Sequence, residues 1–168
     1  MAKVIILCGR IAVGKSYYAN KLKERSNTII LSVDDLMLRL SDFCLGANHD
    51  DMALRCERYF YGLAEQMTNS GIDVIIDFGY WSRKEREEAR EYFRRRGIKS
   101  ELHYILISDE QRIKQLESRN ERLIAESRRN DTGRVYIIDE VLRKRLDQKF
   151  EEPAQEEIDI LITNTCNK

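Results

Sequence analysis

A phosphate-binding pattern near the start of the chain is the clearest sign of chemistry in this sequence. The pattern GxxxxGK followed by Ser or Thr is matched at every position by Gly9-Arg10-Ile11-Ala12-Val13-Gly14-Lys15-Ser16. Glycines let such a loop curl so that successive backbone N–H groups face one phosphate, and the following helix adds its partial positive charge. Lys15 can reach the β- and γ-phosphates, while the Ser16 hydroxyl can hold Mg²⁺. A chance glycine-rich turn is the alternative, but a strand-like run precedes this loop and a helix-like run follows it.

The loop therefore predicts a binding site for ATP with Mg²⁺. We expect the nucleotide to contact Gly9, Ala12, Val13, Gly14, Lys15, Ser16 and Tyr17. A second acid belongs to this chemistry, because Asp77 ends an apolar run and occupies the usual position of a Walker B carboxylate. Asp77 would hold Mg²⁺ through a bound water or orient the acceptor. The alternative is a solvated acid at the end of a strand.

Five apolar runs and the amphipathic segments between them predict how these residues are positioned. The runs cover 3–8, 28–33, 72–77, 101–107 and 158–162. Unbroken apolar strands are typical of a parallel sheet that is covered on both faces. Helices are predicted over 15–25, 50–69, from Ser82 to Gly97, from Ser108 to Arg119, and over 136–149. The predicted fold is α/β, a three-layer P-loop NTPase with a five-stranded parallel sheet, in which ligands lie beyond the carboxyl ends of the strands.

The length and composition of the chain indicate one domain and disfavour some kinds of binding partner. The 168 residues suit one domain over 1–168. Lys plus Arg and Asp plus Glu both number 29, so the formal net charge is zero, which weakly disfavours a broad nucleic-acid-binding surface. The four cysteines are scattered, as expected of reduced thiols in a cytoplasmic protein. No apolar stretch approaches the roughly 18 residues of a membrane span, so we expect no membrane association.

Several features together resemble the compact P-loop kinases that include chloramphenicol phosphotransferase, the zeta-toxin kinases and the kinase domain of bacteriophage polynucleotide kinase. Besides the loop, these are an acidic strand end, the acid at Asp77, an arginine-rich segment at 119–129, and a short motif before the last strand. The acidic strand end is Val33-Asp34-Asp35-Leu36, and the short motif is Lys149-Phe150-Glu151-Glu152-Pro153. The resemblance covers nearly the whole chain, although only the loop is specific by itself.

The resemblance implies roles for Asp34 and for a mobile lid at about 119–134. Asp34 would accept the proton of the attacking hydroxyl, whereas the alternative role is to cap the next helix, for which Asp35 is the better candidate. Arg119 would stack on adenine, and Arg122 together with Arg128, or alternatively Arg129, would contact the transferring phosphate beside Lys15. Each of these arginines could instead be simply solvated. The run 94–96 is explained by the preference of cations for helix ends.

The acceptor is less clearly specified. Polynucleotide kinases carry an arginine three residues after the catalytic aspartate, where this chain has Met37, with Arg39 two residues later. This departure favours a kinase for a small hydroxyl-bearing molecule. The alternatives are a polynucleotide 5′-hydroxyl kinase and a nucleotide-binding regulatory protein without an acceptor. Aromatic residues at 59–61 and 78–81 would either line an acceptor pocket or pack in the core. His103 is expected to be structural, and His49 is a weaker candidate for contact with an acceptor.

Overall fold

The computed structural model describes residues 2–40, 48–130 and 137–163. Its centre is a five-stranded sheet in the order β2-β3-β1-β4-β5, and every neighbouring pair of strands is parallel. The strands are β1 (Lys3–Cys8), β2 (Thr28–Ser32), β3 (Asp73–Gly79), β4 (Lys99–Leu106) and β5 (Ile160–Thr163). The predicted all-parallel sheet is thus confirmed.

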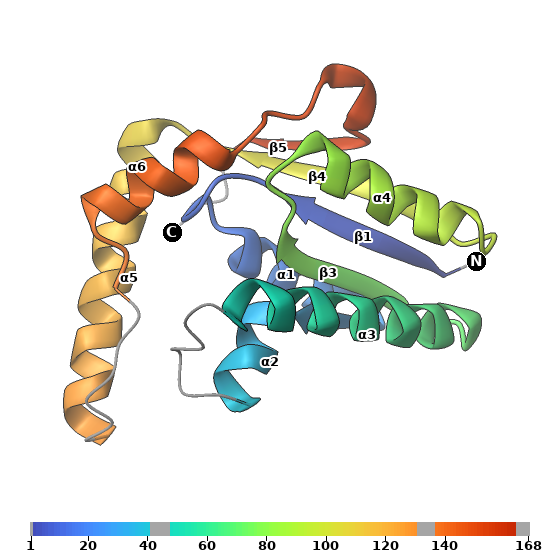
Figure 1. Cartoon of the computed structure of the whole chain (residues 1–168), viewed down its shortest axis with the longest axis horizontal. Coiled ribbons are helices and arrows are strands. Elements are labelled where there is room, and N and C mark those ends of the chain that lie inside the picture. Colours follow the sequence, from blue (N-terminus) through green and yellow to red (C-terminus); the bar gives the residue numbers. More distant parts are fainter. Residues whose placement is uncertain (1, 41–47, 131–136, 164–168) are drawn as a thin grey trace.

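Helices cover both faces of the sheet (Figure 1). One face packs against α3 (His49–Asn69) and α4 (Arg83–Arg94), and the other packs against α1 (Lys15–Arg25). The remaining helices are α2 (Val33–Leu40), α5 (Asp109–Asn130), α6 (Glu140–Lys149) and the 3-10 turn η2 (Gln155–Glu157). Alternate residues of the central strands point into the two cores, as Ile6 and Ile76 do on the α3 side and Ile5 and Ile75 on the α1 side.

The predicted end of the second strand and the predicted cap of the helix after it are wrong. The second strand ends at Ser32, and Val33 already begins α2. The Ser32 hydroxyl accepts a hydrogen bond from the Asp35 N–H at 3.3 Å, which is the contact an N-cap side chain makes. Asp35 is therefore not the cap. It lies in the first turn and pairs with Arg39 at 3.1 Å.

The helix predicted from Ser108 continues well beyond Arg119 and ends at Asn130. Glu, Arg, Leu and Ala dominate this continuation, and they are strong helix formers. The Ser108 hydroxyl accepts from the Gln111 N–H as its spacing predicts. The following helix begins at Glu140 rather than 136, with Asp139 as its cap. The predicted lid thus lies partly in α5, and its residues 131–134 lie outside the described part of the chain.

The apolar stripe of α3 is core, as the more common fate of such a stripe predicts. Cys56, Phe60 and Ala64 are buried against the sheet. Tyr59 is 65% exposed, so the core alternative for the aromatic residues at 59–61 does not hold for this side chain. Across the described ranges, no helix is long and apolar enough to cross a membrane.

Candidate active site

The phosphate loop has the backbone that its sequence predicts. Gly14 precedes α1 with φ 92°, a conformation that side chains with a Cβ rarely adopt. A Cβ on Gly9 would lie 2.7 Å from the backbone oxygen of Ile105 on the neighbouring chain segment, so only glycine fits. The Lys15 ammonium folds back over the loop and donates to the carbonyl oxygens of Gly9 and Arg10, at 2.9 and 3.1 Å. It lies where bound phosphates would replace these carbonyls.

Ser16 and Asp77 meet at the carboxyl edge of the sheet. The Ser16 hydroxyl donates to Asp77 Oδ2 at 2.9 Å, which joins the first turn of α1 to the end of β3. A hydroxyl and a carboxylate are oxygen ligands of the kind Mg²⁺ takes, usually with waters and substrate phosphates completing its shell. No group of three or more His, Cys, Asp or Glu side chains that could hold a metal occurs among the described residues. Ser16 and Asp77 would supply two oxygen ligands to such an ion.

Asp34 lies in the first turn of α2, and its carboxyl group interacts with the charge of Lys15 in the phosphate loop. Its side chain is exposed, yet surrounding protein atoms partly desolvate the carboxyl group and raise its pKa, and the negative charge of Asp77 raises that pKa further. Lys15, His49 and Arg119 act in the opposite direction. The structure thus brings Asp34 into the reach of charges from α1, α3 and α5.

The pKa of Lys15 is affected by the two acids, Asp34 and Asp77. Burial lowers the pKa of its ammonium, and the negative charges of Asp77 and Asp34 oppose that effect. The carboxylates of Asp34 and Asp77 and the ammonium of Lys15 therefore interact with one another beside the phosphate loop. Of the residues predicted for chemistry, the structure brings together Lys15, Ser16, Asp34, Asp77 and Arg119.

The predicted lid arginines differ in their positions. Arg119 is half-buried on α5, and its charge lowers the pKa of Asp34. Arg122 is exposed and is not among the main charges that act on Asp34 or Lys15. Arg128 lies within α5, where its side chain is outside the described part of the structure. Tyr17, expected at the nucleotide, is 45% exposed beside Lys21.

Two arginines that the sequence does not single out organise the surroundings of the loop. Arg10 in the loop pairs with Glu152 at 2.9 Å and with Asp109 at 3.8 Å, and its guanidinium lies 6.0 Å from the centre of the Phe150 ring. The loop is thereby joined to the start of α5 and to the segment after α6. The sequence offers no specific signal for these contacts, because Arg10 occupies a position where the loop pattern permits any residue.

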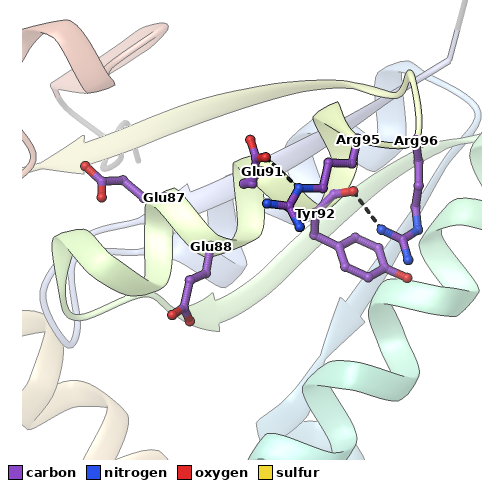
Figure 2. A pocket seen from close by; sticks show the side chains of 6 residues that line it. All are labelled: Glu87, Glu88, Glu91, Tyr92, Arg95 and Arg96. Carbon is purple, nitrogen blue, oxygen red and sulfur yellow. Dashed lines mark hydrogen bonds and ion pairs between the residues drawn. The ribbon is translucent and has the colours of Figure 1, made fainter.

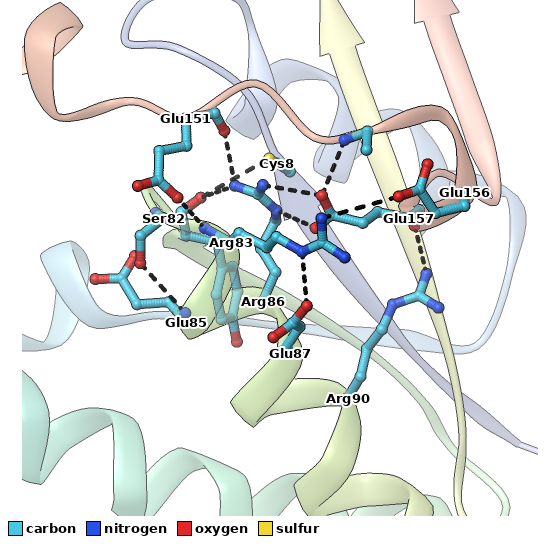
Figure 3. Close-up of polar contacts among 12 residues, drawn as sticks. Cys8, Ser82, Arg83, Glu85, Arg86, Glu87, Arg90, Glu151, Glu156 and Glu157 are labelled. Carbon is cyan, nitrogen blue, oxygen red and sulfur yellow. Dashed lines mark hydrogen bonds and ion pairs between the residues drawn. The ribbon is translucent and has the colours of Figure 1, made fainter.

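Arg86 is buried on α4 and fastens the segment that leads to β5 (Figure 3). Its guanidinium pairs with Glu157 at 2.8 and 3.3 Å and donates to the backbone oxygens of Tyr80 and Glu151. Glu151 N–H in turn donates to the Trp81 oxygen at 2.7 Å. This network holds the segment after α6 against the turn that follows β3. By contrast, Arg94 and Arg95 form the exposed helix-end contacts that their position predicts.

The aromatic residues at and just beyond the end of β3 pack against one another and against the core. Phe78 stacks on Phe60, Tyr61 and Tyr80 with ring centres 5.8–5.9 Å apart. Trp81 meets Phe150 edge to face. His103, also expected to be structural, is buried in β4 and lies 2.9 Å from the Tyr18 hydroxyl. The core alternative is therefore the correct one for these side chains.

A cavity of about 560 Å³ lies elsewhere, on the outer side of α4 (Figure 2). Its lining is formed by Glu87, Glu88, Glu91, Tyr92, Arg95 and Arg96. None of these residues belongs to the loop or to the carboxylates around it, and the guanidinium of Arg96 lies over the ring of Tyr92 at 3.6 Å. The cavity is separate from the candidate site.

The loop, its two acids and the parallel sheet agree with a comparison against protein families. Residues 4–136, more than half of the chain, match the family described as AAA domain. The chain belongs to this family. A comparison with curated proteins finds no similar sequence.

Solved structures resemble the fold of this AAA domain at low sequence identity. The APS kinase CysC of Mycobacterium tuberculosis, in complex with AMPPNP and APS, has a TM-score of 0.63 and 16% identity, covering 99% of this chain and 90% of that one. A chain of the Pnkp1/Rnl/Hen1 RNA repair complex has a TM-score of 0.69 and 16% identity, covering 88% and 43%. Kti12 of Chaetomium thermophilum, in complex with ADP-AlF3, has a TM-score of 0.61 and 14% identity, covering 96% and 88%. These likenesses confirm the predicted kinase-like P-loop fold.

Proposed function

We propose that this AAA domain is an ATP- and Mg²⁺-dependent phosphotransferase that moves the γ-phosphoryl group of ATP to a hydroxyl of a small molecule. The observation that carries the proposal is the position of Asp34. Its carboxyl lies within electrostatic reach of Lys15 but is separate from the Ser16–Asp77 hydrogen bond. A protein that only binds a nucleotide needs the loop and the metal ligands, but it does not need a further carboxylate facing the phosphates.

The roles of the residues follow from the charges that develop. The acceptor oxygen forms a bond to the γ-phosphorus while the bond from that phosphorus to the β–γ bridging oxygen breaks, and ADP leaves. Asp34 takes the hydroxyl proton, and its raised pKa suits a proton acceptor. Lys15 stabilises the charge on the phosphoryl oxygens. In this proposal Arg119 does the same, in place of the adenine contact that the family resemblance implies, because its charge acts on Asp34. Ser16 and Asp77 would hold Mg²⁺, which supplies neutralisation of phosphate charge.

The acceptor is proposed as a small molecule because the features expected of a nucleic-acid kinase are weak. Arg39, the arginine nearest to the position that would grip a 3′-phosphate, is exposed and pairs with Asp35. The net charge is zero. The APS kinase in the comparison acts on a small molecule by its name, which supports the same choice.

An acceptor screen tests this function. Purified protein is incubated with Mg²⁺ and γ-labelled ATP, together with nucleosides, sugar nucleotides, aminoglycosides or 5′-hydroxyl oligonucleotides. Labelled product from a small molecule, absent from Lys15→Ala, supports the proposal. Transfer to the oligonucleotides alone would instead establish the polynucleotide alternative. Tight ATP binding without transfer to any class would favour a regulatory protein.

The two carboxylates are separated by their response to metal. Asp34→Asn should depress transfer by about 10²–10⁴-fold with ATP affinity kept, because a general base contributes roughly that factor. Asp77→Asn should weaken the response to Mg²⁺, and added Mg²⁺ should partly restore its rate, since a weakened metal site obeys mass action. Steady-state rates are measured across a Mg²⁺ titration for both variants. Rescue of Asp34→Asn alone would reverse the two assignments.

A further inference from the structure

Arg112 carries a buried charge on an otherwise exposed arm of the molecule. Only 2% of the residue is exposed, although it lies on α5, which projects beyond the edge of the sheet (Figure 1). Its guanidinium binds both oxygens of Asp147 on α6, at 2.6 and 2.9 Å, and Asp109 Oδ1 at 2.9 and 3.1 Å. A forked, two-oxygen contact fixes direction as well as distance. A buried ion pair is a weak source of stability, so its main physical effect here is to fix geometry.

The same contacts reach the phosphate loop. Asp109 Oδ1, held by Arg112, also lies 3.8 Å from a guanidinium nitrogen of Arg10. Asp109 is largely exposed, and by itself such a pair contributes little. Its orientation, however, is set by the buried side of the network. A continuous chain of charges therefore runs from the loop through Asp109 and Arg112 to Asp147 on α6.

A second contact joins α5 to the segment that leads into α6. The Asn120 side chain exchanges two hydrogen bonds with the backbone of Ile138, at 2.9 and 3.3 Å, and Ile138 is buried. Arg112 meets Asp147, while Asn120, further along α5, meets a residue that precedes α6, so the two segments run antiparallel. The predicted mobile lid at 119–134 thus begins within a helix that is fastened at two points.

Arg119 lies on the fastened side of α5. It follows Arg112 by seven residues, which is about two helical turns and brings both side chains to one face. From that face its charge acts on Asp34. The direction in which Arg119 points is therefore set by the packing of α5 against α6 and by the link to the loop.

We propose that Arg112 is a positioning residue: it couples the phosphate loop to the paired helices α5 and α6, so that they respond to nucleotide as one unit and present Arg119 to the transferring phosphoryl group. The inference rests on the proposed function. It differs from the expectation of a flexible arginine-rich segment, because the proposed moving part is a helix, α5, that is joined to α6 and to the segment before it, and the coupling residue is buried away from the candidate site.

Hydrogen exchange measured with and without AMPPNP and Mg²⁺ tests the coupling. In the wild-type protein, nucleotide should slow exchange in the loop (9–16) and in α6 (140–149). In Arg112→Met, nucleotide should still slow hydrogen exchange in the loop, but it should no longer slow exchange in α6. Lys114→Met is the matched control, since Lys114 lies on the same helix and forms an exposed pair with Glu110. This control should behave as the wild type.

Kinetics provide a readout that a purely structural role would not change. Arg112→Met should lower kcat by about tenfold or more with little change in the KM for ATP, the pattern of an interaction made in the transition state. If Arg112→Met does not fold, Asp147→Asn decides, because the amide keeps the size of the side chain and one acceptor oxygen. If nucleotide still slows hydrogen exchange in α6 of the folded variant, the proposed coupling is wrong, and the kinase proposal remains intact. A wild-type protein in which nucleotide slows neither region would overturn both.

Discussion

Glu57 should make the stability of the protein depend on pH. It lies half-buried on α3 and faces Glu85 and Glu88 of α4, near the hydrogen-bonded hydroxyls of Tyr61 and Tyr80. Burial raises the pKa of the Glu57 carboxyl to about 7, and the charges of Glu85 and Glu88 add to the rise. The folded state therefore favours the protonated form, whereas the unfolded chain ionises near the ordinary value of 4.5.

The magnitude follows from that difference. One pKa unit corresponds to about 1.4 kcal/mol, so the rise from 4.5 to about 7 sets an upper limit of about 3.4 kcal/mol. Glu57 is partly accessible to water, and screening reduces this to about 1–2 kcal/mol. The loss of stability caused by Glu57 is absent below pH 4.5, grows as the pH rises toward 7, and is complete above pH 7. The reason is that between these pH values only the unfolded state ionises freely.

Glu57→Gln removes the ionisable group and should relieve this cost. Urea unfolding at pH 8 should show the variant to be more stable than wild type by about 1–2 kcal/mol, and the two should converge near pH 4.5. Glu24→Gln, which changes an exposed acid on α1, is the control and should show no such pH dependence. A stability difference between Glu57→Gln and wild type that is the same at both pH values would refute the reasoning.

Two further substitutions distinguish binding from folding. Lys15→Ala should abolish phosphoryl transfer while the melting temperature without nucleotide shifts little, because the hydrogen bonds of its ammonium go to carbonyl oxygens of the loop itself; turnover near the wild-type rate would contradict the kinase proposal. Arg86→Met should lower the free energy of unfolding by about 3–5 kcal/mol, because Glu157 loses the partner that compensates its burial. Urea unfolding checks this, and a loss below about 1 kcal/mol would show that water or another group satisfies Glu157.

The parts of this protein that could be predicted from sequence are those fixed by local patterns. The loop at 9–16 is recognisable because phosphate binding requires glycines at positions where a Cβ would collide or strain the backbone, as Gly9 and Gly14 show. The central strands β1 and β3 are recognisable because most of their residues are buried on both faces and so read as unbroken apolar runs, whereas the edge strand β5 is largely exposed although its sequence is apolar. Ser82 and Glu85 form their capping box from residues three apart, which sequence spacing reveals directly.

The parts that could not be predicted depend on partners far apart in the chain. Arg86 pairs with Glu157 across 71 residues, and Arg112 pairs with Asp147 across 35. Arginine is usually an exposed residue, so a sequence pattern assigns both to the solvated sides of their helices. The extent of α5 was missed for a related reason: an arginine-rich segment resembles a loop unless the contacts that hold it, such as Asn120 with Ile138, are known.

Arg86, Arg112 and Arg119 differ in the groups with which their charges interact, and this difference bears on the candidate active site. Arg86 and Arg112 are buried, and carboxylates within the same fold satisfy them. The charge of Arg119 acts on Asp34, a carboxyl whose pKa is raised by burial and by Asp77. Structural pairs leave the charge of a region balanced before a ligand arrives. The proposed function requires cations for the phosphates and a carboxylate for the acceptor's proton, and the charges of Lys15 and Arg119, which both act on Asp34 beside the phosphate loop, agree with that requirement.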